Sequence, residues 1–214
     1  MAAATPTVQA LTGDWVIDKS KSENIDGALK LQGIGWLRRK AVTSGTITLK
    51  VAQNTDTSSQ PQKMNVMMQQ GLRGIFPGVE QTRALDWTEH EHVDAVSGAK
   101  IFVKSRFVKG LRDGEKMKPV LSVESEVPAK EKAGAEEFLA APVAGAVPVD
   151  GEGEGLEKAF VQDLIRCPDG GWTAEQVWAV TASGDGARLV CKAVAVKDSS
   201  LEQACQVYQL AEQQ

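Results

Sequence analysis

A single helical segment interrupts a chain that otherwise reads as strands and turns. Residues 24–40 contain two short apolar-periodic runs separated by Gly33 and Gly35, and glycine lets the backbone turn without Cβ strain. About ten strand-like runs surround this segment, with tight-turn sequences such as 168–171 between them. Antiparallel strands joined in this way remove exposed sheet edges by closing into a barrel. The sequence therefore predicts an all-β fold, an antiparallel up-and-down β-barrel with a pair of short helices over 24–43.

The chain also contains one stretch that a compact barrel does not need. Residues 129–155 begin with a run that could form a short helix and then become rich in Ala, Gly and Pro. A connection of this length is usually either functional or disordered. We expect one domain over 1–214 in which 129–155 is a flexible insertion, and the alternative is a mobile flap that contacts the cavity through Phe138 and Leu139. The expected strands are 11–18, 46–51, 63–69, 82–93, 100–108, 119–127, 156–167, 172–181, 187–196 and 204–211.

Composition excludes several classes of partner. The 28 acidic residues outnumber the 24 basic ones, so the basic surface needed for nucleic-acid binding is not expected. No apolar run approaches the roughly 20 residues that cross a bilayer, and residues 1–9 lack the pattern of a secretory signal. Cys167, Cys191 and Cys205 are odd in number and not closely paired, which favours reduced thiols in a cytoplasmic protein.

The helical segment also carries a family resemblance. Its sequence resembles the helix-turn-helix lid of the intracellular fatty-acid-binding proteins, a branch of the calycin β-barrels, and residues 11–16, 189–192 and 205–208 look like the first and last two strands of that barrel. The length of the chain is more similar to the extended, lipocalin-like proteins of fungi. The resemblance implies a closed cavity that holds one apolar small molecule. The matching lid residues are Asn24, Ile25, Leu29, Lys30, Gly33, Ile34, Gly35, Trp36, Arg39 and Lys40.

The last strand departs from the family pattern. Family members that carry fatty acids have an inward Arg-x-Tyr pair there, and the guanidinium binds the ligand carboxylate. Here Gln206 replaces that Arg while Tyr208 is retained, and the second interior Arg of the family would fall near Gln176 or Trp178. An unpaired buried carboxylate is costly, so the resemblance with this departure implies a neutral ligand. Gln206 and Tyr208 would donate hydrogen bonds into the cavity, or alternatively satisfy only buried backbone groups.

Candidate residues for chemistry lie on two expected strands. His90 and His92 share a strand face with Asp86 and Asp94, and an imidazole beside carboxylates suits general acid or base work. The alternative is an outward polar face. Two histidines and a carboxylate without a further ligand cluster do not indicate a metal site. Arg106, if it points inward, could polarise a ligand carbonyl, whereas outward solvation is the alternative.

Aromatic and flexible apolar side chains are candidates for the cavity wall. The flat faces of Trp36, Trp87 and Trp178 suit aromatic or polyene ligands, and Met67 belongs to a set of adaptable methionines. Ordinary core packing is the alternative for each of them. The expected ligand-binding residues are Leu29, Trp36, Met67, Trp87, Gln176 and Trp178.

Two functions fit these features. The first is binding of a neutral hydrophobic small molecule, such as a secondary-metabolite intermediate, in a lidded cavity. The alternative is a cofactor-free pericyclase or cyclase, for example a hetero-Diels–Alderase acting on a polyketide or terpenoid, as found among small lipocalin-like fungal barrels. Such an enzyme works by orientation and a few hydrogen bonds. Its donors would come from Tyr208, Gln206, His90 and Arg106. We expect no cofactor and no metal, and the sequence leaves the oligomeric state open.

Overall fold

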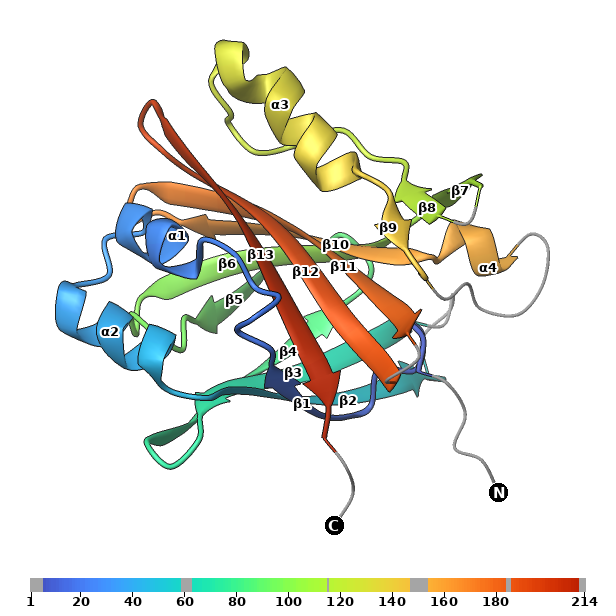
Figure 1. The fold of residues 1–214 in the computed structure, drawn as a ribbon, viewed down its shortest axis with the longest axis horizontal. Coiled ribbons are helices and arrows are strands. Elements are labelled where there is room, and N and C mark those ends of the chain that lie inside the picture. Colours follow the sequence, from blue (N-terminus) through green and yellow to red (C-terminus); the bar gives the residue numbers. More distant parts are fainter. Residues whose placement is uncertain (1–5, 59–62, 115, 147–153, 184–185, 212–214) are drawn as a thin grey trace.

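The computed structural model describes residues 6–58, 63–114, 116–146, 154–183 and 186–211 (Figure 1). Its ten-stranded sheet contains β1 (Gly13–Ile17), β2 (Ile47–Asp56), β3 (Lys63–Leu72), β4 (Phe76–Ala84), β5 (His90–Val93), β6 (Lys100–Val108), β10 (Phe160–Cys167), β11 (Trp172–Ser183), β12 (Gly186–Lys197) and β13 (Ser200–Leu210). A second sheet contains β7 (Gly110–Asp113), β8 (Lys116–Pro119) and β9 (Val143–Ala144). The helices are α1 (Ile25–Leu31), α2 (Trp36–Ser44), α3 (Ala129–Ala140) and α4 (Glu154–Glu157).

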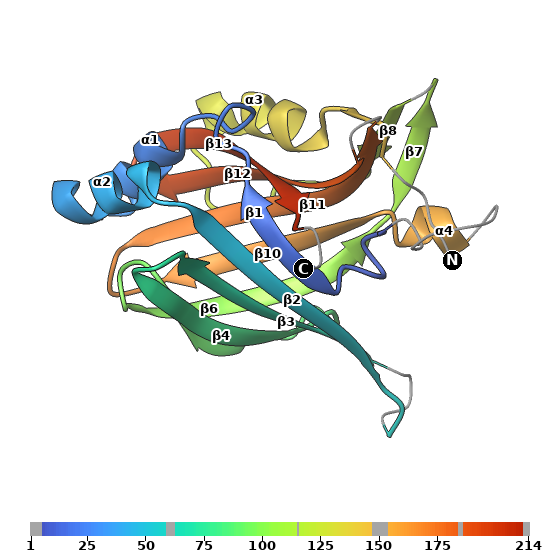
Figure 2. The same ribbon diagram turned by 60° about the horizontal axis from the view of Figure 1, so that its bottom comes forward.

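The large sheet curls into a nearly closed barrel (Figure 2). Its strand order is β4-β3-β2-β1-β13-β12-β11-β10-β6-β5, and every neighbouring pair is antiparallel. The two end strands approach each other, and Gln81 Nε2 of β4 donates to the Val93 carbonyl of β5 at 2.9 Å. The predicted antiparallel barrel of about ten strands is therefore confirmed.

The helical pair lies between β1 and β2 in the sequence and beside one end of the barrel, as Figures 1 and 2 show. Asn24 precedes α1 in a left-handed conformation, with φ of 52°, and its side chain does not cap the helix. Its amide instead donates to Glu202 Oε2 and to the Gln203 carbonyl, both at 2.8 Å. The predicted lid is confirmed, and Asn24 ties it to β13.

The expected single strand over 82–93 is two strands. β4 ends at Ala84, and β5 begins at His90. Between them Trp87 adopts a left-handed conformation, with φ of 61°, and the Asp86 carboxylate accepts a hydrogen bond from the Thr88 backbone amide at 2.9 Å. This local turn changes the direction of the chain. The alternation of apolar and polar residues in the sequence does not indicate such a turn.

The barrel has an inner core and an outer one. Apolar side chains of β1, β2, β3, β12 and β13 pack inside the barrel, around the fully buried Trp15 and Tyr208. On the outer face of β11 and β12, Val177, Val194 and Val196 pack against helix α3. Both faces of these strands are therefore covered, which is the arrangement that continuous apolar strands require.

The segment that covers the outer face is residues 120–146, which we call the strap. The sequence predicts a flexible insertion over 129–155, but the first half of this segment forms the regular helix α3. That helix buries the side chains of Ala135 and Leu139 completely. Burial of these side chains against the apolar outer face of the barrel is the physical reason for the order. Residues 147–153 of the expected insertion lie outside the described residues. The expected strand over 119–127 is instead the end of β8 and an irregular run.

A buried carboxylate fixes the irregular run of the strap. Glu175 of β11 is fully buried on the outer face. It accepts hydrogen bonds from the backbone amides of Glu124 and Ser125 at 2.9 and 3.0 Å, from Ser125 Oγ at 3.1 Å, and from Gln162 Nε2 at 2.5 Å. Four donors compensate the cost of burying this group. Separately, no helix in the described part of the chain has the length and apolarity needed to span a membrane.

Candidate functional site

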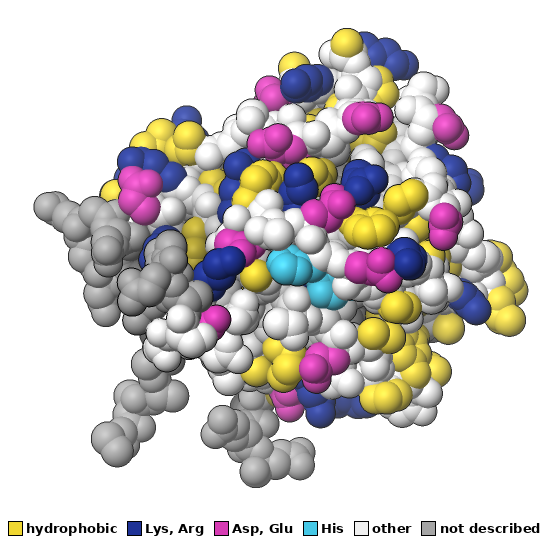
Figure 3. Space-filling view, turned by 180° about the vertical axis from the view of Figure 1, so that it is seen from behind, with side chains coloured by type: hydrophobic (Ala, Val, Ile, Leu, Met, Phe, Trp, Pro, Cys, Tyr) yellow, Lys and Arg dark blue, Asp and Glu magenta, His cyan; other side chains and the backbone are white. Residues whose placement is uncertain are grey.

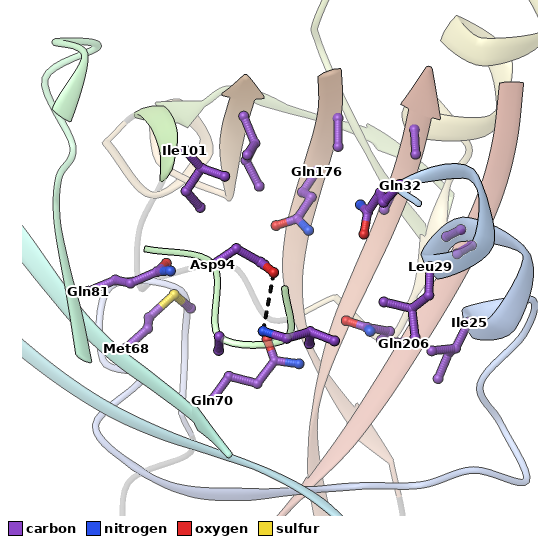
Figure 4. Close-up of a pocket in the computed structure, with 18 of the residues that line it drawn as sticks. Ile25, Leu29, Gln32, Met68, Gln70, Gln81, Asp94, Ile101, Gln176 and Gln206 are labelled. Carbon is purple, nitrogen blue, oxygen red and sulfur yellow. Dashed lines mark hydrogen bonds between the residues drawn. The ribbon is translucent and has the colours of Figure 1, made fainter. Parts of the chain in front are cut away.

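The main cavity lies inside the barrel, below α1 (Figure 4). Its volume is about 120 Å³, which is small beside the roughly 300–1,000 Å³ of typical ligand sites. The lid contributes Ile25, Ala28, Leu29 and Gln32, and the remaining walls come from strands and from the loop before β6. The other lining residues are Leu49, Met68, Gln70, Val79, Gln81, Arg83, Asp94, Ala95, Val96, Ile101, Ile165, Trp172, Ala174, Gln176, Trp178, Ala193, Ala195, Ala204 and Gln206.

Glutamine is the most frequent polar residue in this lining. Gln32 approaches from the lid, Gln70 and Gln81 from one wall, and Gln176 and Gln206 from the opposite wall, as Figure 4 shows. Each amide can both donate and accept hydrogen bonds without carrying charge. The Oε1 atom of Gln176 is buried and has no hydrogen-bond partner within the described residues. This wall therefore offers neutral polar groups to a ligand.

An ion pair stands inside the barrel beside these amides. Arg83 Nη1 of β4 contacts Asp163 Oδ2 of β10, and the Arg83 side chain also donates from Nη2 to Gln81 Oε1 at 2.9 Å. The Asp163 carboxylate further accepts hydrogen bonds from Ser105 Oγ at 2.5 Å and from Trp178 Nε1 at 2.8 Å. The side chains of Arg83 and Asp163 are 11% and 1% exposed. The interior cation is thus already paired.

Gln206 and Tyr208 share the inward face of β13, the orientation that the family resemblance implies. Tyr208 is fully buried behind the cavity, and its hydroxyl donates to Gln206 Oε1 at 3.1 Å. Burial raises the pKa of Tyr208 well above its usual range, and the nearby Cys191 adds to this effect. The phenol therefore remains a protonated donor that orients the amide of Gln206, which itself lines the cavity.

The two histidines face the open seam of the barrel between β4 and β5. Figure 3 shows them side by side on that face of the molecule. The Nε2 atoms of His90 and His92 are buried and have no hydrogen-bond partner in the described chain. Burial lowers the pKa of His92, and the positive charge of Arg83 lowers it further. A neutral imidazole at this position can accept or donate one proton.

Of the ten predicted site residues, Leu29, Gln176, Trp178 and Gln206 line the cavity. Trp36 does not, because it begins α2 and is 67% exposed while α1 supplies the face toward the cavity. Met67 is also absent from the lining, since its neighbour Met68 has the inward orientation. A difference of one residue reverses the face of a strand.

Arg106 and Trp87 lie together on the outer side of the barrel. The guanidinium of Arg106 sits 4.0 Å from the centre of the Trp87 ring. It also donates to Gln162 Oε1 at 2.8 Å and to Glu124 Oε1 at 3.1 Å, which connects it to the strap. The expected inward roles of Arg106 and Trp87 therefore differ from their positions, because Arg106 pairs with Glu124 of the strap and Trp87 stacks against Arg106 outside the barrel.

Sequence reasoning missed the Arg83–Asp163 pair and three of the lining glutamines. A signal for Asp163 exists, because it is an acidic residue within the otherwise apolar strand 160–167. Its partner Arg83 is 80 residues away in the sequence, and no local pattern connects the two. Among the described residues, no group of three or more His, Cys, Asp or Glu side chains is placed to hold a metal ion.

The strand order, the helical pair after the first strand and the near closure give this chain a fatty-acid-binding-protein-like fold of the calycin kind. No family model and no curated protein matches the sequence. Similar solved structures include a fatty-acid-binding protein from Manduca sexta, with 15% identity and a TM-score of 0.48 over 93% of this chain and 98% of that chain. The extracellular fatty acid binding protein As-p18 has 13% identity and a TM-score of 0.45, over 98% and 100% of the two chains. A zebrafish ileal bile acid-binding protein complexed with cholic acid has 11% identity and a TM-score of 0.41, over 94% and 98%.

Proposed function

We propose that this protein binds a neutral, mainly apolar small molecule with one or two polar groups in the cavity below α1. The observation that carries the proposal is the composition of the cavity wall, where aliphatic side chains and uncharged amides line the same space (Figure 4), together with Trp172 and Trp178. Apolar walls with a few convergent polar groups are typical of small-molecule sites. The buried, unpartnered Oε1 of Gln176 supports a ligand that donates a hydrogen bond, such as an alcohol.

Binding accounts for the positions of the candidate groups better than catalysis does. Of the four candidate catalytic residues, Gln206 lines the cavity, Tyr208 stands behind it, His90 faces the seam and Arg106 lies outside the barrel. A pericyclase would need its donors to converge on one reacting group. We also propose a reducing, cytoplasmic location, which the free thiols of Cys167, Cys191 and Cys205 support.

A cavity-filling variant tests the site. Nile red, a neutral apolar dye, should bind the protein with increased fluorescence, and Leu29→Trp should weaken that binding at least tenfold because the indole fills the space under the lid. Leu37→Trp is the matched control, since Leu37 is 74% exposed on α2, and it should bind as the wild type does. Equal affinities of wild type and Leu29→Trp would place the binding site elsewhere.

A further inference from the structure

The cavity contains one cationic lining residue among those that the structure describes, and that residue is Arg83. A guanidinium inside an apolar barrel is a strong partner for a ligand carboxylate. Its position beside Gln81 and Trp178 on the cavity wall would allow such a contact. The chemistry of this wall therefore depends on whether Arg83 is available.

Asp163 neutralises the charge of Arg83, although the Nε atom of Arg83 is buried without a hydrogen-bond partner in the described residues. Its carboxylate contacts the Arg83 guanidinium and is held in place by Ser105 and Trp178, which donate to it from two different strands. At 1% exposure, this carboxylate already occupies the place of an acidic ligand group. A second, small pocket lies beside the pair, and apolar side chains such as Leu11 and Val66 line it together with Arg83 and Asp163.

We propose that Asp163 determines the specificity of the cavity by acting as an internal substitute for a ligand carboxylate. This inference rests on the proposed function. A carboxylate ligand would enter a cavity lined by Asp94 and by Arg83, the one cationic residue of the described lining, whose charge Asp163 already neutralises, and burying an uncompensated charge is unfavourable. A neutral hydroxyl needs only the amides of Gln176 and Gln206. Asp163 thus excludes acidic ligands and leaves neutral ones unaffected.

Matched ligands test the inference. Displacement of Nile red by 1-decanol and by decanoate compares two ligands with the same alkyl chain and different charge. Wild-type protein should bind 1-decanol at least tenfold more tightly than decanoate. In Asp163→Asn the amide keeps the partners Ser105 and Trp178 while releasing Arg83, and the affinity for decanoate should rise at least tenfold.

Three further variants separate the alternatives. Asp94→Asn removes a negative charge from the same cavity without releasing a guanidinium, so it should gain little affinity for decanoate. The double variant Arg83→Gln/Asp163→Asn has no interior ion pair and should remain selective for 1-decanol. Gln206→Arg adds a cation to the lining at a position whose neighbour on β12 is Cys191 and not Asp163, and it should gain decanoate binding even if Asp163→Asn fails to fold.

Each outcome decides between the two proposals. If wild type binds 1-decanol but neither Asp163→Asn nor Gln206→Arg gains decanoate, the specificity role of Asp163 is overturned and the binding function stands. The specificity role also fails if wild type binds decanoate as tightly as 1-decanol, or if Asp94→Asn gains as much as Asp163→Asn. If no form of the protein binds Nile red or either ligand, both proposals fail.

Discussion

At the scale of single residues, the barrel interior contains polar groups of two kinds. Asp163 has three donors around it, whereas Gln176 Oε1 and the Nε2 atoms of His90 and His92 have no partner within the described residues. Buried polar groups in folded proteins are usually satisfied by protein or water. A ligand or solvent molecule would therefore form its most favourable hydrogen bonds with the unpartnered groups, whereas the paired groups make the wall rigid.

The pKa of His92 gives a prediction for stability against pH. Burial, together with Arg83 and His90, lowers this pKa below its ordinary value of 6.5, and Asp163 opposes the shift in part. Above pH 6.5 the imidazole is neutral in both the folded and the unfolded state. As the pH falls below it, the unfolded chain binds the proton first, so the free energy of unfolding decreases until the lower pKa of the folded state is reached.

Urea denaturation at pH 7.5 and pH 5.5 measures this effect. The His92→Gln variant should lose less stability between these two pH values than the wild type does, because Gln has no proton to bind. Both proteins contain the same carboxylates, so the difference between their two losses of stability does not include the contribution of those carboxylates. Identical losses in the two proteins would show that His92 does not titrate differently in the folded and unfolded states.

Alternation along strands predicted single side chains well where the register was anchored. The spacing of Gln206 and Tyr208 put both on one strand face, the family resemblance implied that this face points inward, and Gln176 and Trp178 share the inward face of β11. The prediction of Met67 as a residue of the cavity wall is displaced by one position. The run 63–69 has similar residues on both faces of its strand, so the sequence does not indicate which face points inward. The inward ion pair of Arg83 with Asp163 depends on long-range closure of the barrel, which periodicity does not encode.

At the scale of elements, the lid is attached to the barrel wall through Asn24. This residue combines a left-handed backbone with two side-chain hydrogen bonds to β13. Asn tolerates that conformation better than most residues with a side chain. The first helix therefore begins at a point that is fixed both by its backbone geometry and by its neighbours.

Two substitutions at Asn24 separate these contributions. Asn24→Ala loses both hydrogen bonds and strains the backbone, so it should lower stability by about 1–3 kcal/mol. Asn24→Gly loses the hydrogen bonds while relieving the backbone and should cost less. Hydrogen exchange of the amides in α1 should be faster in Asn24→Ala than in Asn24→Gly, and slowest in wild type. Unchanged exchange of these amides in both variants would contradict this account.

Elements with strong local signals were predictable. The glycines and apolar spacing of 24–43 indicated two helices, and the strand over 172–181 matched its apolar run. Helix α3 was harder, because its hydrophobic face is short and the valines that it covers on β11 and β12 read as ordinary strand residues. Which face of such strands meets a helix is decided by tertiary packing.

At the scale of the whole molecule, the strap makes the barrel a two-layered structure on one side (Figure 1). Leu139 of α3 is fully buried against the outer face of the sheet, while Glu175 holds the preceding segment through three hydrogen bonds. We propose that the strap and the barrel unfold as one cooperative unit, because β11 and β12 contribute to both cores.

Truncation of Leu139 tests this cooperativity. Leu139→Ala should lower the free energy of unfolding by about 2–5 kcal/mol, as expected for a large-to-small change in a core. Urea transitions followed by far-ultraviolet circular dichroism and by tryptophan fluorescence should shift together. Lys132→Ala, at an exposed position of the same helix, should change stability by less than about 0.5 kcal/mol. Two separate transitions in Leu139→Ala would show that the strap unfolds independently.

The seam between β4 and β5 has a mechanical consequence. Every other junction of the barrel wall is a row of backbone hydrogen bonds, whereas in the described residues these two strands end the ladder and Gln81 joins them through its side chain to the Val93 carbonyl. Widening the wall there breaks the Gln81 contact and the Arg83–Asp163 pair, which also crosses the seam, whereas widening it elsewhere breaks a whole row of backbone hydrogen bonds. The barrel is therefore stiff around most of its circumference and compliant along one line. A guest too bulky for the resting cavity would stretch the protein in that direction, and the lid could stay in place.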